Sequence, residues 1–241
     1  MISFFKKKQI IDNLAWLGVD IHNHLLPEID DGAKDLQQSV QLINSLTNLG
    51  LESFICTPHV YPDLYPNTPD TIADALSKLK STAALPVENH RISAAAEYLV
   101  DDNFLPNNQL LCISDNYLLI EIPYASEIKN LEQIIFDLQI KGYKVILAHP
   151  ERYLMYYKNH DRLSRLKDRD VLFQLNLLSV SGYYGKDVRL FAEFILSKKW
   201  YDFAGTDLHH QKHADELTKI VNSGYLFKSV GDYPFQNKLL L

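Results

Sequence analysis

Cysteine is scarce in this chain, which has two among its 241 residues, Cys56 and Cys112. Two thiols are too few for the framework of a disulfide-rich domain, and we expect both to be reduced and buried. A structural zinc site built from several thiolates is excluded for the same reason. Any metal or catalytic site must therefore use other side chains.

Long apolar runs and an excess of basic charge are missing as well. No stretch approaches the length that spans a membrane, and Met1–Lys8 places its lysines after a short apolar stretch, the reverse of a signal peptide. The 24 basic and 30 acidic residues give a formal net charge of -6, so no global attraction draws the chain to nucleic acid. We expect a cytoplasmic protein with no membrane span and no nucleic-acid partner.

The rest of the composition is that of an ordinary globular protein, with 46% hydrophobic and 22% charged residues. The length suits one sizeable core, and neither a repeat nor a linker composition interrupts it. We therefore expect a single domain over residues 1–241, in which residues 1–15 form an N-terminal extension.

Short β-rich runs alternate with stretches of helical period, which predicts repeated βα units around a parallel sheet or barrel. Apolar residues recur at helical spacing in 36–46, 72–79, 131–138, 188–196 and 214–221, and Gly50 and Gly142 stand where a helix C-cap is expected. The pattern predicts strands at Val19–Ile21, Ser53–Thr57, Arg91–Ala95, Tyr117–Ile122, Val145–Ala148, Leu172–Asn176 and Phe203–Thr206.

Histidines and carboxylates follow these strands one after another. Alternate residues of an extended segment share a face, so His22 and His24 can reach one ion. Such a pair alone is weak evidence, but the recurrence at successive strand ends indicates a metal site at the carboxyl edge of the fold. The further residues in this phase are His59, Glu97, His149, Asp207 and His209.

The order of these motifs resembles the PHP (polymerase and histidinol phosphatase) superfamily of metal-dependent phosphoesterases. The resemblance runs from Val19 to about His209, and it is more specific to the bacterial PHP-type protein-tyrosine phosphatases of capsule and exopolysaccharide loci. The motifs that carry it are H-x-H, D-D-G-A (Asp30 to Ala33), T-P-H, A-E-Y, H-P-E-R-Y (His149 to Tyr153), Gln174-Leu175-Asn176 and T-D-x-H.

This resemblance implies a distorted seven-stranded (β/α) barrel, the PHP fold, with three divalent ions, usually manganese, at the C-terminal ends of the strands. Arg152 would grip the phosphate, and the implied catalytic residues are Arg152, Glu97 and His149. One ligand comes from the D-D-G run, where Asp30 is the alternative to Asp31. The implied ligands are His22, His24, Glu97 and Asp207 for one ion, Glu97 and His149 for a second, and Asp31, His59 and His209 for the third.

The activity implied by the resemblance is hydrolysis of phosphotyrosine on a protein, with a bacterial tyrosine kinase of polysaccharide export as the expected partner. A homo-oligomer is also expected, because the family includes oligomers. Imidazole and carboxylate ligands suit manganese, iron or zinc. A phenol, with a pKa of about 10, leaves as phenolate without demanding a general acid.

Other functions compete with this one. The same ligands would serve a small-molecule phosphatase acting on histidinol phosphate, while the charge of -6 argues against a PHP nuclease. A scaffold without activity is disfavoured, because every expected ligand position is filled. A thiol-based phosphatase is excluded, since Pro62 and Leu118 stand where the Arg six residues after its cysteine would be.

Several further residues are expected to have supporting roles or no role in the site. The loop Pro58–Pro69 is long and stiff enough to contribute to a binding rim. Glu151 is interpreted as a supporting residue beside the site. The histidines outside the motifs are read as ordinary surface or core residues, and they are His90, His160, His210 and His213.

Overall fold

The computed structural model describes residues 11–82, 91–104 and 110–241. Part of the expected N-terminal extension, including Lys6 to Lys8, and His90 lie outside these residues. Within the described part of the chain, no helix is long and apolar enough to cross a membrane.

The fold is α/β, with parallel strands in two sheets. One sheet has the order β1-β2-β4 and the other the order β3-β5-β6-β7-β8-β9, and every neighbouring pair is parallel. The strands are β1 (Val19–Asp20), β2 (Ser53–Cys56), β3 (His59–Val60), β4 (Arg91–Ala94), β5 (Glu97–Leu99), β6 (Tyr117–Glu121), β7 (Lys144–Ala148), β8 (Leu172–Asn176) and β9 (Phe203–Gly205).

All seven strands predicted from the sequence are confirmed to within about two residues at each end. The short strands β3 and β5 were not predicted. Each follows another strand after two residues, β3 after β2 and β5 after β4, and it pairs in the other sheet. The segments β2-β3 and β4-β5 therefore carry the chain from one sheet into the other.

The carboxyl ends of β1 and β9 also meet, although these strands belong to different sheets. The amide of Asp207 donates to the carbonyl of His22 at 2.7 Å, and the amide of His24 donates to the carbonyl of Leu208 at 3.0 Å. In the same contact between β1 and β9, which we call the seam, the buried carboxylate of Asp20 accepts from the hydroxyl of Thr206 at 2.6 Å. These bonds place the residues after β1 beside those after β9.

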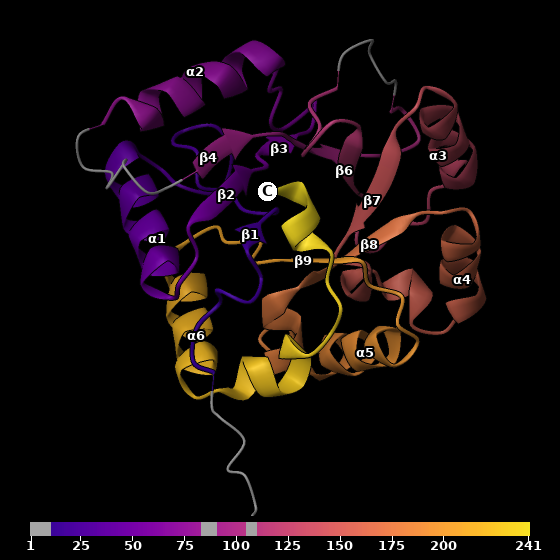
Figure 1. Cartoon of the computed structure of the whole chain (residues 1–241). Coiled ribbons are helices and arrows are strands. Elements are labelled where there is room, and N and C mark those ends of the chain that lie inside the picture. Colours follow the sequence, from indigo (N-terminus) through magenta and orange to yellow (C-terminus); the bar gives the residue numbers. More distant parts are fainter. Residues whose placement is uncertain (1–10, 83–90, 105–109) are drawn as a thin grey trace, which may run out of the picture.

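Among the described residues, six α-helices lie around the outside, as Figure 1 shows. Asp35 caps the first, where its side chain accepts from the amide of Gln38, and Thr68 forms a capping box with Thr71 at the second. Gly50 (φ +89°) and Gly142 (φ +92°) follow helix ends as predicted. The helices are α1 (Leu36–Asn48), α2 (Pro69–Lys80), α3 (Leu131–Ile140), α4 (His160–Asp168), α5 (Lys186–Ser197) and α6 (Gln211–Asn222).

The strands bury side chains on both faces. Leu118 and Leu147 pack with helix residues in the larger core cluster, whereas the adjacent Leu119 and Ile146 belong to a smaller cluster made mostly of strand residues. The C-terminal 3-10 helix Asn237–Leu240 lies in the middle of the ring of helices in Figure 1, and Leu240 packs against the smaller cluster. A Cβ on Gly18, just before β1, would lie 2.8 Å from Cγ of Lys238, and the Asn237 side chain donates to the carbonyl of Val19, so this segment packs against the start of β1.

Candidate metal centre

The carboxyl ends of the strands hold a cluster of histidines and carboxylates beside a cavity of about 450 Å³. The segments after β1, β7 and β9 contribute to it, as do β3, β5 and the end of β6. Four groups of its residues have ligand atoms within 4.8 Å of one another: His24, Asp31, His59 and His209; His22, His24 and Asp207; His22, Glu97 and His149; His59, Glu97 and Glu121.

Glu97 lies at the centre of this cluster and is fully buried. Its Oε2 is 3.2 Å from Nε2 of His22 and 3.1 Å from Nδ1 of His59, while its Oε1 is 3.3 Å from Nε2 of His149. Nε2 of His24 is 3.5 Å from the same Oε2. One carboxylate therefore faces four imidazoles, an arrangement in which it could bridge two ions.

Asp207 is a second carboxylate that contacts more than one histidine. Its Oδ1 is 3.4 Å from Nε2 of both His22 and His24, and the whole residue is 2% exposed. The two histidines of the H-x-H motif thus converge on one carboxylate, as their shared face predicted.

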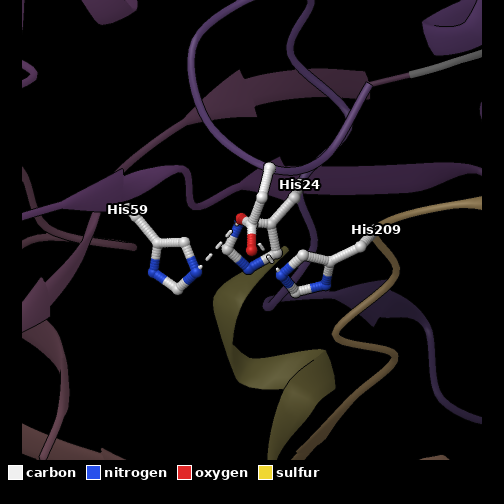
Figure 2. A group of neighbouring side chains, drawn as sticks. His24, His59 and His209 are labelled. Atoms are coloured by element: carbon white, nitrogen blue, oxygen red, sulfur yellow. Dashed lines mark ion pairs between the residues drawn. The ribbon is translucent and has the colours of Figure 1, made fainter. Parts of the chain in front are cut away.

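A third group opens toward the cavity. Figure 2 shows the rings of His24, His59 and His209 directed toward one another. The rings of His24 and His209 stack with centroids 3.8 Å apart, and Oδ1 of Asp31 is 3.5 Å from Nε2 of His59 and 3.6 Å from Nε2 of His209. The side chain of Asp31 is 50% exposed, so this group is the most accessible of the four.

The two aspartates of the D-D-G run have different roles. The Asp30 side chain is fully buried, and its Oδ2 is 2.7 Å from Nδ1 of His24 and accepts the amide of His59. Burial alone would raise the pKa of Asp30, but the charge of His24 and hydrogen bonds from His24 and Gly32 lower it to about 2. Asp30 is thus occupied in orienting histidines, which leaves Asp31 as the aspartate that faces the cavity.

Hydrogen bonds on the far nitrogens fix which ring atom faces the cluster. Nδ1 of His22 is 2.8 Å from Oε1 of Gln174, and Nδ1 of His209 is 2.9 Å from the carbonyl of Asp207. Both oxygens can only accept, so in the neutral ring Nδ1 carries the proton and Nε2 keeps its lone pair for a metal. Asp30 does the same for His24.

The buried polar atoms of the cluster fit divalent cations. Nε2 of His22, Nε2 of His24 and both carboxylate oxygens of Glu97 are buried without a hydrogen-bond partner among the described residues. Such atoms are costly to leave unpaired, and all of them are metal-ligand types. Burial alone would lower the pKa of His22, but the charges of Glu97 and Asp207 raise it to about 9, so the cluster attracts positive charge.

The backbone of the site is specialised to bring these groups together. A Cβ on Gly32 would lie 2.2 Å from the carbonyl oxygen of His24, so only glycine allows the D-D-G turn to approach β1. His149 (φ +32°) and Asp207 (φ +51°) have left-handed backbones, which cost about 1 to 3 kcal/mol each and tend to occur at functional sites.

Arg152 stands on the wall of the same cavity. It donates from Nη1 to Oδ2 of Asp207 at 2.9 Å, and its guanidinium carbon lies over the rings of Tyr124 and Tyr184, 4.7 Å and 4.3 Å from their centroids. These two cation–π contacts restrict the orientation of the planar fork. A guanidinium on the cavity wall can donate further hydrogen bonds to an anion.

The family to which the chain belongs follows from comparison with known proteins. The model of one family, described as capsular polysaccharide synthesis, CpsB/CapC, matches residues 18–233. The chain belongs to the CpsB/CapC family.

Curated relatives and solved structures agree with this membership. Tyrosine-protein phosphatase YwqE of Bacillus subtilis is 31% identical over 86% of this chain and 85% of its own length. Tyrosine-protein phosphatase CpsB of Streptococcus pneumoniae is 23% identical over 80% of this chain and 83% of its own length.

A structure from the crystallographic work on these two proteins, described as metal-dependent tyrosine phosphatases, matches with a TM-score of 0.81. It is 28% identical and covers 92% of this chain and 94% of its own. A lactonase from Listeria monocytogenes, 12% identical with a TM-score of 0.51, covers 93% of this chain and 91% of its own and shares the fold alone.

All the site residues predicted from the sequence of this CpsB/CapC-family chain lie in or beside the cluster. The sequence reading missed Glu121, whose Oε1 is 3.1 Å from Nδ1 of His59. Glu121 ends β6, so the rule that found the other strand-end residues would also have found it.

The histidines outside the motifs were interpreted as ordinary surface or core residues, and the structure agrees with this only in part. His160 stacks on Phe194 at 4.1 Å, away from the site. His210 and His213 were interpreted as ordinary residues, yet both line the cavity beside His209. The start of α6 brings them there, where the His210 side chain accepts from the amide of His213.

Two supporting features take the places suggested for them. Tyr61 and Tyr65 of the Pro58–Pro69 loop line the cavity, in agreement with a binding rim. Glu151 is buried and accepts from the amide of Asn176 and the hydroxyls of Ser179 and Tyr201, at 2.9, 2.7 and 2.9 Å. It thereby anchors the turn that carries His149 and Arg152.

Proposed function

We propose that this chain is a metal-dependent protein-tyrosine phosphatase, a phosphoric monoester hydrolase that releases phosphate from phosphotyrosine on a protein. Membership of the CpsB/CapC family and the names of its relatives support the activity. The observation that carries the proposal is the pairing of an unsatisfied histidine–carboxylate cluster with a clamped arginine in one cavity.

The metal assignment is part of the proposal. Three divalent ions, manganese in preference to iron or zinc, would use the ligands His22, His24, Asp31, His59, Glu97, Glu121, His149, Asp207 and His209. Glu97 would be shared between ions, as its contacts with four histidines suggest. Bound ions of this kind stabilise charge on phosphoryl oxygens and lower the pKa of water.

The protein's own groups bind and orient the ester. Arg152 offers donors to the phosphoryl oxygens, and the rings of Tyr124 and Tyr184 keep its guanidinium in place. Tyr61 and Tyr65 line the cavity, where they can contact an aromatic leaving group. Phenolate departs readily, since the phenol has a pKa of about 10.

The finer architecture and the partner belong to the same proposal. Counting β2-β3 and β4-β5 as one segment each gives seven strand segments, and the bonds between the ends of β1 and β9 favour their closure into a distorted barrel. The family description favours a substrate that acts in capsular polysaccharide synthesis, and we propose a bacterial tyrosine kinase of polysaccharide export.

The decisive experiment measures phosphate release from a phosphotyrosyl peptide and from histidinol phosphate, with added manganese and again with a chelator. We expect manganese-dependent turnover of the peptide, loss of turnover with the chelator, and little release from histidinol phosphate. A preference for histidinol phosphate would replace the substrate while keeping the metal site. No turnover of either compound would overturn the proposed activity.

A further inference from the structure

A second cavity, of about 620 Å³, lies beside the candidate metal centre. Tyr61 and Leu99 line both cavities, so the two spaces are neighbours that share a wall. A volume of this size is within the range that holds a drug-sized molecule, and therefore accommodates more than one side chain.

The wall between the cavities is held firmly. Tyr61 and Tyr65 form a β-bridge, with their amides and carbonyls joined at 2.9 and 2.7 Å, and the ring of Tyr65 stacks on His59. The side-chain amide nitrogen of Asn67 donates to the carbonyls of Ile29 and His59, both at 2.8 Å. The second cavity is thus fixed in position relative to the cluster.

Its lining combines apolar surface with acidic charge. Val60, Pro62 and Tyr98 contribute apolar surface, and the hydroxyl of Tyr98 is already engaged as an acceptor of the Leu111 amide. Asp63 and Asp101 are its charged members, and no basic side chain is among the described residues that line it. The metal-centre cavity, in contrast, contains Arg152.

We propose that this second cavity binds the peptide residues that flank phosphotyrosine, and that it selects an apolar side chain next to a lysine or arginine. The inference rests on the proposed function. Because Tyr61 and Leu99 line both cavities, the second cavity lies next to the space in which an ester beside Arg152 would bind, and the two aspartates complement a cation on the flanking chain. An acidic flank would place like charges together.

The test compares two phosphotyrosyl peptides of equal length that carry a leucine on each side of the phosphotyrosine. Beyond the leucines, one peptide has lysines and the other has glutamates. The measured quantity is the ratio of kcat/KM for the basic peptide to that for the acidic peptide. We expect a ratio on the order of tenfold for the natural sequence, since exposed ion pairs are individually weak.

Three variants separate the cavity from the overall charge. The double variant Asp63→Asn with Asp101→Asn should lower this ratio toward one. The double variant Asp63→Lys with Asp101→Lys should bring the ratio below one, so that the acidic peptide is preferred. The matched control, Asp12→Asn with Asp74→Asn, removes the same charge at two exposed positions that line neither cavity. It should keep the ratio of the natural sequence.

Each outcome decides the inference. Equal ratios in the cavity and control variants would overturn the subsite, because net charge would then explain the preference. A natural ratio near one would overturn it too. If free phosphotyrosine is hydrolysed while the peptides are not discriminated, only the subsite fails. No release from free phosphotyrosine or from either peptide would overturn the proposed function and the subsite with it.

Discussion

Asp207 joins Arg152 to the histidine pair, because its Oδ2 accepts from the arginine at 2.9 Å while its Oδ1 is 3.4 Å from Nε2 of His22 and of His24. The group that orients the arginine proposed to bind phosphate is thus also a proposed metal ligand. Anion binding and metal binding are therefore expected to be coupled through this one carboxylate.

Replacing Asp207 with asparagine tests this coupling. Asn keeps the shape of the side chain but removes its charge, so we expect both lower metal content and a fall in kcat/KM of at least about 100-fold. Elemental analysis and phosphate release measure the two effects. Asp168→Asn, at an exposed position of α4, is the control, and an active Asp207→Asn protein with full metal content would contradict the shared role.

The clamp around Arg152 leads to a separate prediction. Tyr184→Leu removes one of the two rings that contact the guanidinium, and also the hydroxyl that accepts from the side-chain nitrogen of Asn176 at 3.2 Å. We expect KM for a phosphotyrosyl peptide to rise about tenfold, with metal content unchanged, because the proposed ligands keep their positions. Arg152→Lys should raise KM further, since an ammonium group cannot reproduce the forked donors of the guanidinium. Loss of metal in either variant would show that this wall supports the cluster itself.

Much of the fold was predictable because it depends on local patterns. The seven predicted strands are confirmed, and Gly50 and Gly142 follow helices, since periodicity and capping are written in neighbouring residues. β3 and β5 were missed although β1 and β9 are equally short, because each follows another strand after only two residues and the sequence shows no turn or helix that separates the pair. Their pairing is decided by how the segments cross between the sheets.

The site was predictable in its strand-end residues and not in its supporting contacts. His22 and Gln174 are 152 residues apart in sequence, and nothing in either neighbourhood indicates that they meet. The choice between Asp30 and Asp31 likewise needed the packing of Asp30 against His24. His210 and His213 reach the cavity only because α6 begins beside the residues that follow β9.

The pH dependence of metal binding follows from the raised histidine pKa values. Burial alone would lower the pKa of His24, but the charge of Asp30 raises it to about 10, while His22 is raised to about 9. Protons therefore compete with metal at neutral pH, and the affinity for manganese should rise as the pH increases from 6.5 toward 9. Isothermal titration of metal-free protein measures it, and a flat or falling affinity would contradict the assigned ligands.

The same shifts predict opposite stability trends with and without metal. A raised folded-state pKa stabilises metal-free protein below the unfolded pKa of about 6.5, and this contribution is lost as the pH rises through about 9 to 10. The melting temperature of chelated protein should therefore fall over that window, whereas the increment produced by manganese should grow. If the melting temperatures with chelator and with manganese changed in parallel with pH, these histidines would not exchange protons for metal.

The last prediction concerns the seam between β1 and β9 at the end far from the cluster. Asn237 is fully buried; its amide nitrogen donates to the carbonyls of Val19 at 2.9 Å and Ala204 at 2.7 Å, and its oxygen accepts the Ala204 amide at 3.0 Å. One side chain thus links two strands that belong to different sheets.

Asn237→Ala should leave these buried backbone groups unpaired and lower the free energy of unfolding by about 2 to 4 kcal/mol. Chemical denaturation measures the loss, and Asn222→Ala, at the exposed end of α6, is the matched control. Because the proposed ligands lie at the opposite ends of the strands, kcat/KM per folded molecule should stay within about twofold of the natural value. A large loss of activity with unchanged stability would instead mean that the seam positions the residues after β1 and β9, and that the two ends of the fold are mechanically coupled.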